Sequence, residues 1–281
     1  MNITELFENS LKYPAGNWVK VIILGVLLLI PSIFAILLGV SAIFRQPILT
    51  AVLGVIFVIL LIVLTFIIYG YSLSVTRETI SRSDDLPEFQ WMKNFIDGIK
   101  YFIVHIVYYI IPVAITLLVA YLTGFFEQFA TLWNYVLQSF TAASQNATIT
   151  ATNATMIPPQ LIADLQTSAI IVAVVAIILF IIFSLLLMIA IAKLAETNSL
   201  GAAVSLGDVF QDIGKIGWGK YIVWFILLYV IIFIIQAIVG ALGSVPLLGF
   251  IIGIISVLVI TPYLTIFSSR ALGLIYNESK E

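Results

Sequence analysis

Six long runs of apolar residues, separated by short polar stretches, dominate the pattern along the chain. About 20 helical residues cross the roughly 30 Å hydrocarbon core of a bilayer, and each run reaches that length. The pattern therefore predicts an all-α polytopic membrane protein with six transmembrane helices. The runs cover residues 19–44, 48–75, 101–123, 168–191, 221–242 and 247–267.

The polar stretches between these runs predict three transmembrane hairpins. Arg45-Gln46-Pro47 leaves room only for a tight turn between the first two runs, and residues 243–246 do the same between the last two. The third and fourth runs are joined by a longer loop, which we place at residues 124–167.

An amphipathic segment precedes each predicted hairpin, and each segment contains the pattern Phe-x-(Asp/Asn)-x-x-Lys. This spacing is typical of a helix that lies along the membrane interface. We expect the Phe to lie in the acyl boundary, the Lys to reach phosphate headgroups, and the Asp or Asn to face water. The three copies are Phe7/Asn9/Lys12, Phe95/Asp97/Lys100 and Phe210/Asp212/Lys215.

Aromatic residues mark the same zone. Trp18, Trp91 and Trp218 lie near the starts of the first, third and fifth runs, as residues of an aromatic belt do. His105, the single histidine, lies about one turn into the third run. We expect it to bond to a headgroup or to a backbone carbonyl rather than to transfer protons.

The three copies of the pattern are consistent with a repeat of three parallel units at residues 2–80, 86–197 and 202–276, all within a single membrane domain spanning 1–281. Parallel repeats about an axis along the membrane normal occur in known transporter folds. In the alternative, any helix at this interface favours Phe and Lys, and the three matches are coincidental.

Basic residues set the expected orientation. Of the 12 Lys and Arg residues, all but Arg45 fall on the side of the membrane that holds both termini. Cytoplasmic segments carry the excess of positive charge, so we predict a cell-membrane protein with both termini in the cytoplasm. The net charge of −2 does not favour a nucleic-acid partner.

The predicted outer loop, residues 124–167, contains no Lys or Arg. Apolar residues recur at helical spacing from 125 to 140, which predicts that Gly124 breaks the third helix and that an aromatic amphipathic helix follows along the outer interface. Asn146 and Asn153 each begin an N-glycosylation sequon. Glycosylation and chance are both open, because a stretch rich in Asn and Thr forms sequons easily.

The inventory of reactive residues is thin. The middle of each run lacks Asp, Glu, Lys and Arg, and the chain has no Cys. No P-loop, H-E-x-x-H or G-x-S-x-G motif occurs. We therefore expect no enzymatic activity, no cofactor and no metal site. The expected partners are membrane lipids and, as a further option, other membrane proteins.

An acidic cluster formed by Asp84, Asp85 and Glu88 follows the second run, close to Arg77 and Arg82. It could bind a cation or a headgroup. We favour a solvated loop in which these charges neutralise one another.

The segment at residues 86–100, Leu-Pro-Glu-Phe-Gln-Trp-Met-Lys-Asn-Phe-Ile-Asp-Gly-Ile-Lys, resembles the hallmark of an archaeal membrane family catalogued as domain of unknown function 4013. Phe89 stands where that family commonly has Trp. The resemblance implies a multi-pass membrane protein and no assigned activity. In physical terms, Pro87 suits the first turn of the interfacial helix, and Gly98 suits a close approach to the following span.

These observations favour a non-enzymatic protein that organises the membrane or binds partner proteins. The alternative is a transporter or channel for a small or lipid-like molecule. Pro31, Pro112 and Pro262 lie within three of the runs and predict kinks, which either shape packing or line a transport site. A polar cavity beside these prolines would favour transport, whereas a packed interior with lateral apolar grooves would favour organisation.

Overall fold

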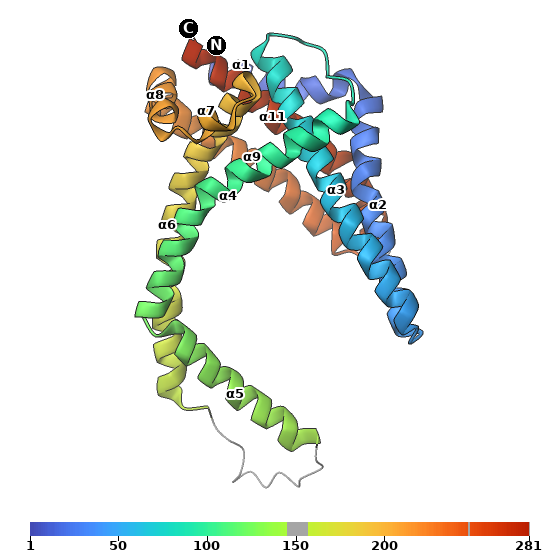
Figure 1. Cartoon of the computed structure of the whole chain (residues 1–281), viewed down its shortest axis with the longest axis vertical. Coiled ribbons are helices and arrows are strands. Elements are labelled where there is room, and N and C mark those ends of the chain that lie inside the picture. Colours follow the sequence, from blue (N-terminus) through green and yellow to red (C-terminus); the bar gives the residue numbers. More distant parts are fainter. Residues whose placement is uncertain (145–156, 247, 281) are drawn as a thin grey trace. The chain divides into compact units, whose positions relative to one another are not determined.

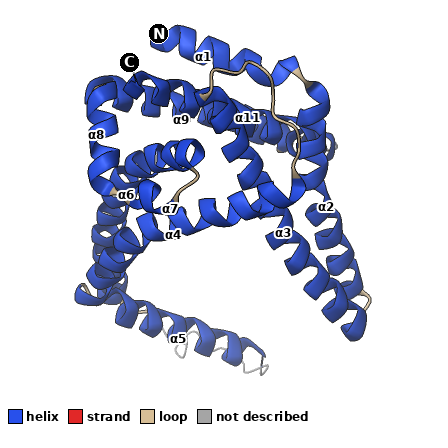
Figure 2. Ribbon diagram, turned by 45° about the horizontal axis from the view of Figure 1, so that its top comes forward, coloured by secondary structure: helices blue, strands red, loops and turns tan. Residues whose placement is uncertain are grey.

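The computed structural model describes residues 1–144, 157–246 and 248–280 (Figure 1). Within these ranges every regular element is helical (Figure 2). Six helices are long and apolar enough to cross a membrane, which confirms the prediction of an all-helical chain with six such segments. They are α2 (Trp18–Ile43), α3 (Pro47–Ile80), α4 (Trp91–Leu122), α6 (Pro159–Thr197), α9 (Trp218–Gly243), and a composite of α10 (Leu248–Ile255), the π-helical turn η2 (Ser256–Ile260) and α11 (Thr261–Asn277).

Shorter helices lie between the long ones and at the two termini. They are α1 (Ile3–Lys12), η1 (Tyr13–Gly16), α5 (Phe125–Ser144), α7 (Leu200–Val204), α8 (Leu206–Ile216) and η3 (Glu278–Lys280). Local sequence explains their ends. Asn2 and Glu5 form a capping box at the start of α1. Gly124 (φ 71°) and Gly217 (φ 90°) take left-handed backbone conformations that suit glycine, and they separate α4 from α5 and α8 from α9.

The second amphipathic segment is not a separate helix. Helix α4 begins at Trp91 and runs without a break through Asp97 and Lys100 to Leu122. Pro87 therefore lies before the helix rather than in its first turn, contrary to expectation. Residues 86–90 are held outside the helix because Pro87 O accepts a hydrogen bond from Tyr71 (3.2 Å) and Phe89 stacks on the Tyr71 ring at 4.0 Å.

The chain divides into two compact units. Unit 1 contains residues 1–106 and 185–281, and unit 2 contains residues 107–184. In unit 2, Tyr109 Oη and Ser184 Oγ lie 3.0 Å apart, and the Ser168 hydroxyl donates to Gln128 Oε1 at 2.6 Å. In unit 1, α2 and α3 pack through a core that includes Val21, Leu24, Ile67 and Tyr71.

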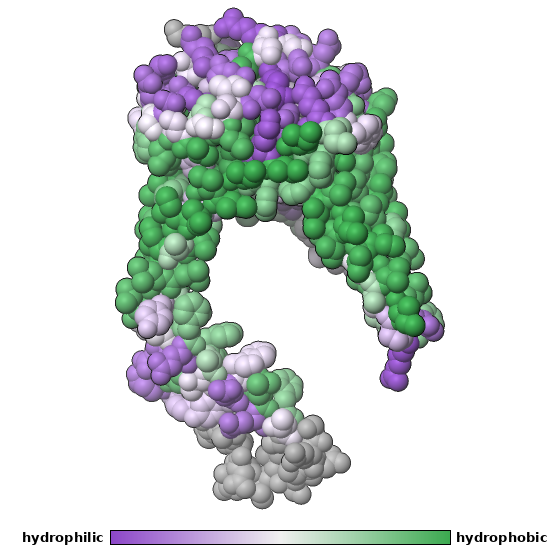
Figure 3. Space-filling view, in the orientation of Figure 1, coloured by the Kyte–Doolittle hydropathy of each residue, from purple (hydrophilic) through white to green (hydrophobic). Residues whose placement is uncertain are grey.

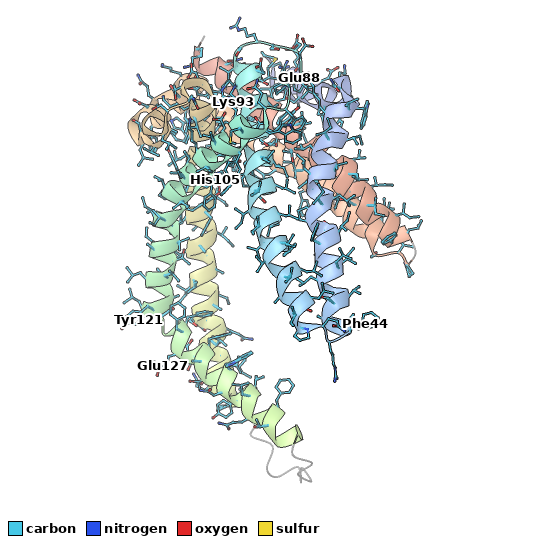
Figure 4. All side chains as sticks on the ribbon, turned by 45° about the vertical axis from the view of Figure 1, so that its right-hand side comes forward. Phe44, Glu88, Lys93, His105, Tyr121 and Glu127 are labelled. Atoms are coloured by element: carbon cyan, nitrogen blue, oxygen red, sulfur yellow. The ribbon has the colours of Figure 1, made fainter. Side chains whose placement is uncertain are left out.

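Polar and apolar residues of unit 1 are segregated. Polar side chains gather at the end that holds both termini, while apolar side chains cover the lengths of the helices (Figure 3). Glu88 and Lys93 lie at this polar end, and Phe44 lies at the opposite end of α2 (Figure 4). We call the polar end of unit 1 the polar layer.

Helix packing accommodates the prolines within the long helices. Pro31 lies inside α2 and Pro112 inside α4, whereas Pro262 is the second residue of α11, just after the π-helical turn. A π turn widens the ladder where proline removes a donor. At this point α2 comes close: a Cβ on Gly25 would lie 2.0 Å from Leu258 O, so only glycine fits there.

Candidate functional site

Three of the basic residues in the polar layer lie near the ends of different long helices: Arg77 on α3, Lys193 on α6 and Arg270 on α11. Each one contacts the central residue of one copy of the Phe-x-(Asp/Asn)-x-x-Lys pattern. We call these contacts the three junctions. They join Arg77 Nη1 to Asp97 Oδ2 (3.0 Å), Lys193 Nζ to Asp212 Oδ2 (2.6 Å), and Arg270 Nε to Asn9 Oδ1 (3.0 Å).

The junctions follow a cyclic order. Helix α3 contacts α4, helix α6 contacts α8, and helix α11 contacts α1. In the first two, a helix contacts the pattern that comes next in the chain. In the third, the last long helix contacts the first short one, which closes the cycle (Figure 1).

Both aspartates at the junctions are buried. Asp97 is 3% exposed and Asp212 is 4% exposed, so the expectation that they would face water is wrong. A buried carboxylate is tolerated when it is paired and hydrogen-bonded. Each also has the lysine of its own pattern nearby, with Lys100 Nζ at 3.9 Å from Asp97 and Lys215 Nζ at 4.0 Å from Asp212.

At the third junction, the charge of Arg270 is balanced by a residue outside the pattern. Arg270 is 3% exposed, and Asn9 opposite it is neutral. Its Nη2 donates to Asp84 Oδ1 (2.6 Å) and its Nη1 to Ser83 O (2.6 Å). Its guanidinium carbon lies 4.3 Å from the centre of the Tyr13 ring.

Two members of the acidic cluster form ion pairs with cations on helices that are distant in the sequence. Asp84 pairs with Arg270, and Glu88 pairs with Lys20 at 2.8 Å. The neighbour expected from the sequence, Arg77, is engaged with Asp97 instead. Burial raises the pKa of Tyr13 to about 12, so its phenol stays protonated and donates to Asp85 O at 2.8 Å.

Close helix contact accompanies the α3–α4 junction. A Cβ on Gly70 would lie 1.7 Å from Asn94 O, and a Cβ on Gly98 would lie 1.8 Å from Phe66 O. The backbones of α3 and α4 therefore cross with no room for a side chain. Gly98 serves this contact with the preceding long helix, not an approach to the following span.

The aromatic residues predicted at the interface lie mostly on the surface. Trp18, Trp91, Trp218 and Phe210 are exposed, and Phe210 packs near Trp218 with ring centres 5.8 Å apart. Phe95 is half-buried, with its ring centre 5.8 Å from that of Phe66.

Phe7 differs from its counterparts. It is buried against Phe267, contrary to the expectation that it would lie in the acyl boundary.

The remaining predicted contact residues are dispersed. Lys12 bonds to Glu8 at 2.6 Å, and Lys100 donates to Asn198 Oδ1 at 2.8 Å. His105 Nδ1 lies 3.0 Å from Tyr101 O, a backbone-carbonyl contact. The two sequon residues, Asn146 and Asn153, fall outside the residues that the structure describes.

A cavity of about 190 Å³ in unit 1 is lined by all three helices that carry the junction cations. Its polar lining consists of hydroxyl groups, and its apolar lining comes mainly from α6 and α9. The lining residues are Ser72, Thr76, Tyr101, Met188, Ile191, Leu228, Tyr229, Ile232, Ser268, Ser269 and Leu272.

A second hollow, about 250 Å³ in volume, lies between α2 and α3 beside Pro31. Its lining is apolar apart from the hydroxyls of Ser32 and Thr65. Among the residues with described positions, no group of three or more His, Asp or Glu side chains lies where it could hold a metal ion.

The three cations were missed by reasoning from the sequence, although a signal for two of them is present. Arg77 precedes Asp97 by 20 residues, and Lys193 precedes Asp212 by 19. Each lies just beyond a long apolar run. A charged side chain at that point, where the helix is still largely covered, needs a partner of opposite charge. Arg270 occupies the same place after the last run, but its partner Asn9 lies 261 residues away.

Comparison with known proteins gives one match. The family described as "Protein of unknown function (DUF4013)" matches residues 52–244, more than half of the 281-residue chain. No curated protein matches, and no solved structure matches. The matched range includes the first two junctions but neither partner of the third.

Proposed function

The chain belongs to this family of unknown function, and we propose that it is a non-enzymatic, multi-pass protein of the cell membrane that organises lipids or binds partner membrane proteins. The proposal starts from the apolar surface of the six long helices. It also uses the distribution of charge in the polar layer and the chemistry of the hollows.

The observation that carries the proposal is the small fraction of each apolar helix that the chain itself covers. In the most apolar part of α2, 28% of the residues are buried, and the value is 17% for both α3 and α9. Large side chains such as Ile36, Val55 and Phe233 are more than 60% exposed. Contiguous apolar surface of this extent needs acyl chains or partner helices to cover it.

The charge distribution supports an orientation with the polar layer and both termini in the cytoplasm. The layer contains almost all the basic residues, whereas Arg45 lies alone in the turn between α2 and α3. Positive charge favours the cytoplasmic side. The exposed residues Trp18, Trp91 and Trp218 would then lie at the cytoplasmic interface, in contact with lipid headgroups.

The junctions support the further proposal that the chain consists of three hairpin units with interfacial helices α1 and α8. A cation at the end of one unit contacts the pattern that opens the next, and the third contact returns to the first unit. A coincidence of composition would not place the central residue of the pattern opposite a helix-end cation in every copy.

The same contacts favour a structural role over catalysis. The buried carboxylates of Asp97 and Asp212 are held by cations within hydrogen-bonding distance, in pairs that fasten one helix to another. At 3% and 4% exposure, neither carboxylate is open to a substrate.

Transport of a small or lipid-like molecule is the second candidate. The hollow beside Pro31 is largely apolar, as expected for a groove that contacts acyl chains, and it favours organisation over a polar pathway. The observation that favours transport is the cavity lined by hydroxyl groups, which offers polar contacts to a small molecule.

One experiment separates the two candidates. The purified chain is reconstituted into liposomes, retained native lipids are identified by mass spectrometry, and lipid exchange between leaflets is followed with a quenchable fluorescent lipid. We expect retained lipids and an exchange rate equal to that of empty liposomes. Rapid exchange or solute flux would overturn the proposed role and establish transport.

The orientation has its own test, which benefits from the absence of cysteine. Lys93→Cys and Gln160→Cys provide single labelling sites on the exposed parts of α4 and α6. In intact cells we expect an impermeant maleimide to label Gln160→Cys and to spare Lys93→Cys. The reverse pattern would overturn the orientation while leaving the fold intact.

A further inference from the structure

The cavity in unit 1 lies at the boundary between the apolar helices and the polar layer. Thr76 and Ser269 line it, and each directly precedes a junction cation, Arg77 or Arg270. On its other side lie apolar residues of α9, including Leu228 and Ile232. In a bilayer this depth is where the headgroup of a lipid meets its acyl chains.

The serine and threonine hydroxyl groups of the cavity are oriented as acceptors. Ser72, Ser268 and Ser269 each donate their proton to a carbonyl of their own helix, at distances of 2.8 to 3.1 Å. The Thr76 hydroxyl is within 3.1 Å of Ser72 O and 3.2 Å of Ser269 O. Because a hydroxyl oxygen keeps two lone pairs after donating, these groups offer acceptors to a ligand with O–H donors.

None of the described residues that line the cavity carries a formal charge. The nearest cations in sequence, Arg77 and Arg270, are engaged with Asp97 and Asp84. Oxygen acceptors with no cation in the lining disfavour a phosphate and favour a neutral hydroxyl group. The volume of about 190 Å³ corresponds to roughly six water molecules at ~30 Å³ each, which is enough for a small polyol headgroup.

We propose that this cavity binds the hydroxyl-bearing headgroup of an uncharged lipid, whose acyl chain extends along the apolar lining. The inference deepens the proposed function, since it names the lipid class that the protein holds. The hydroxyls of Ser72, Thr76, Ser268 and Ser269 accept the hydrogen bonds of the headgroup. Met188 and Leu228 contact the first methylene groups of the chain.

The test uses the full chain in nanodiscs of phosphatidylcholine with one of two photoactivatable probes. The first probe is a monoacylglycerol, which has two free hydroxyl groups, and the second is a lysophosphatidic acid with the same acyl chain. Crosslinked peptides are mapped by mass spectrometry. We expect the monoacylglycerol to label the segments 72–76, 228–232 and 268–272 at least fivefold more than the lysophosphatidic acid.

The variants test which atoms hold the headgroup. Removing one neutral hydrogen bond lowers affinity about fivefold, so Ser72→Ala combined with Ser268→Ala should reduce labelling more than tenfold. Ser32→Ala is the matched control, because its hydroxyl also donates to its own helix but lines the separate hollow beside Pro31. Thermal unfolding checks that all variants fold.

Three other results would overturn the proposal. Competition by free glycerol would show that the cavity takes the free polyol rather than a lipid, and would overturn the proposal. Stronger labelling by lysophosphatidic acid would assign the cavity to an anionic headgroup, because Arg77 Nη2 is buried without a hydrogen-bond partner, and would overturn the proposal. Equal labelling of the wild type and the double variant would also overturn it.

These failures are distinguishable from a failure of the proposed function. If the cavity is not labelled while native lipids remain bound to the reconstituted chain, the inference fails and the organising role stands. If the liposome assay shows transport while the cavity is still labelled, the organising role fails and the site stands.

Discussion

The α3–α4 junction and the α11–α1 junction use the same pattern position in two different ways. At the first, Asp97 is buried and pairs directly with Arg77. At the second, the neutral Asn9 is exposed, and Arg270 forms its ion pair with Asp84 in the loop after α3. The pattern thus fixes where two helices meet, and the surroundings decide which group neutralises the cation.

The difference follows from how each pattern is attached to the chain. Asp97 lies within a helix that continues into a long apolar segment, so its carboxylate is carried to a fixed buried place. Asn9 lies on α1, which η1 separates from α2. A short helix attached in this way is held by several contacts, including the hydrogen bond from the Tyr263 hydroxyl to Leu11 O.

Asp97→Ala should have the largest effect among the changes that test this comparison. It leaves the half-buried Arg77 without its carboxylate partner, and breaking a largely buried pair on one side costs on the order of 3 kcal/mol. The unfolding free energy in detergent, measured by tryptophan fluorescence, gives the value. Asp164→Ala, at an exposed site in unit 2, is the control and should change it by less than about 1 kcal/mol. Similar values for the two variants would contradict a structural role for the junction.

Gly98→Ala should come next. Its new Cβ would collide with Phe66 O and force α3 and α4 apart, at a cost of about 1–3 kcal/mol. Gly214→Ala on α8 is the matched control, because a Cβ there meets nothing within 4 Å. That control should be neutral or stabilising by up to about 1 kcal/mol through helix propensity. Thermal unfolding of both variants decides, and an unchanged Gly98→Ala would refute the close crossing.

Tyr13 makes the third junction sensitive to high pH. Its pKa is raised to about 12 in the fold, whereas the unfolded chain loses the proton near pH 10. The stability from the protonated phenol is therefore complete below pH 10 and is lost as the pH rises through 12. At pH 11 the loss should be on the order of 1 kcal/mol relative to Tyr13→Phe, which lacks this titration. Parallel stability curves for the two proteins from pH 9 to 12 would disprove it.

Asn9→Ala should have the smallest effect. Asn9 is exposed and makes one of several contacts to Arg270, so its loss should cost about 1 kcal/mol. Asn9→Asp tests the same point from the other side, since the loop carboxylate of Asp84 already neutralises Arg270. We expect its unfolding free energy to lie within about 1 kcal/mol of the wild type. A loss as large as that of Asp97→Ala would mean that the two junctions are equivalent after all.

The sequence alone predicted the long elements and missed the contacts between them. Charge-free runs of more than 20 residues can be stable only as membrane-length helices, so the six long helices follow from composition and length. The start of α4 was less predictable, because Pro87 is a good first-turn residue. The contacts of Pro87 and Phe89 with Tyr71 hold that segment outside the helix.

The amino-acid sequence by itself determined that the chain is helical, that six segments are suited to a bilayer, and where charge is concentrated. These properties depend on hydropathy and helical hydrogen bonding, which act within each segment. Only the tertiary structure decided that Asp97 and Asp212 are buried, that Arg270 meets Asn9, and that six hydroxyl-bearing residues line one cavity. Such contacts join residues far apart in the chain, and their energies depend on the close packing that brings them together.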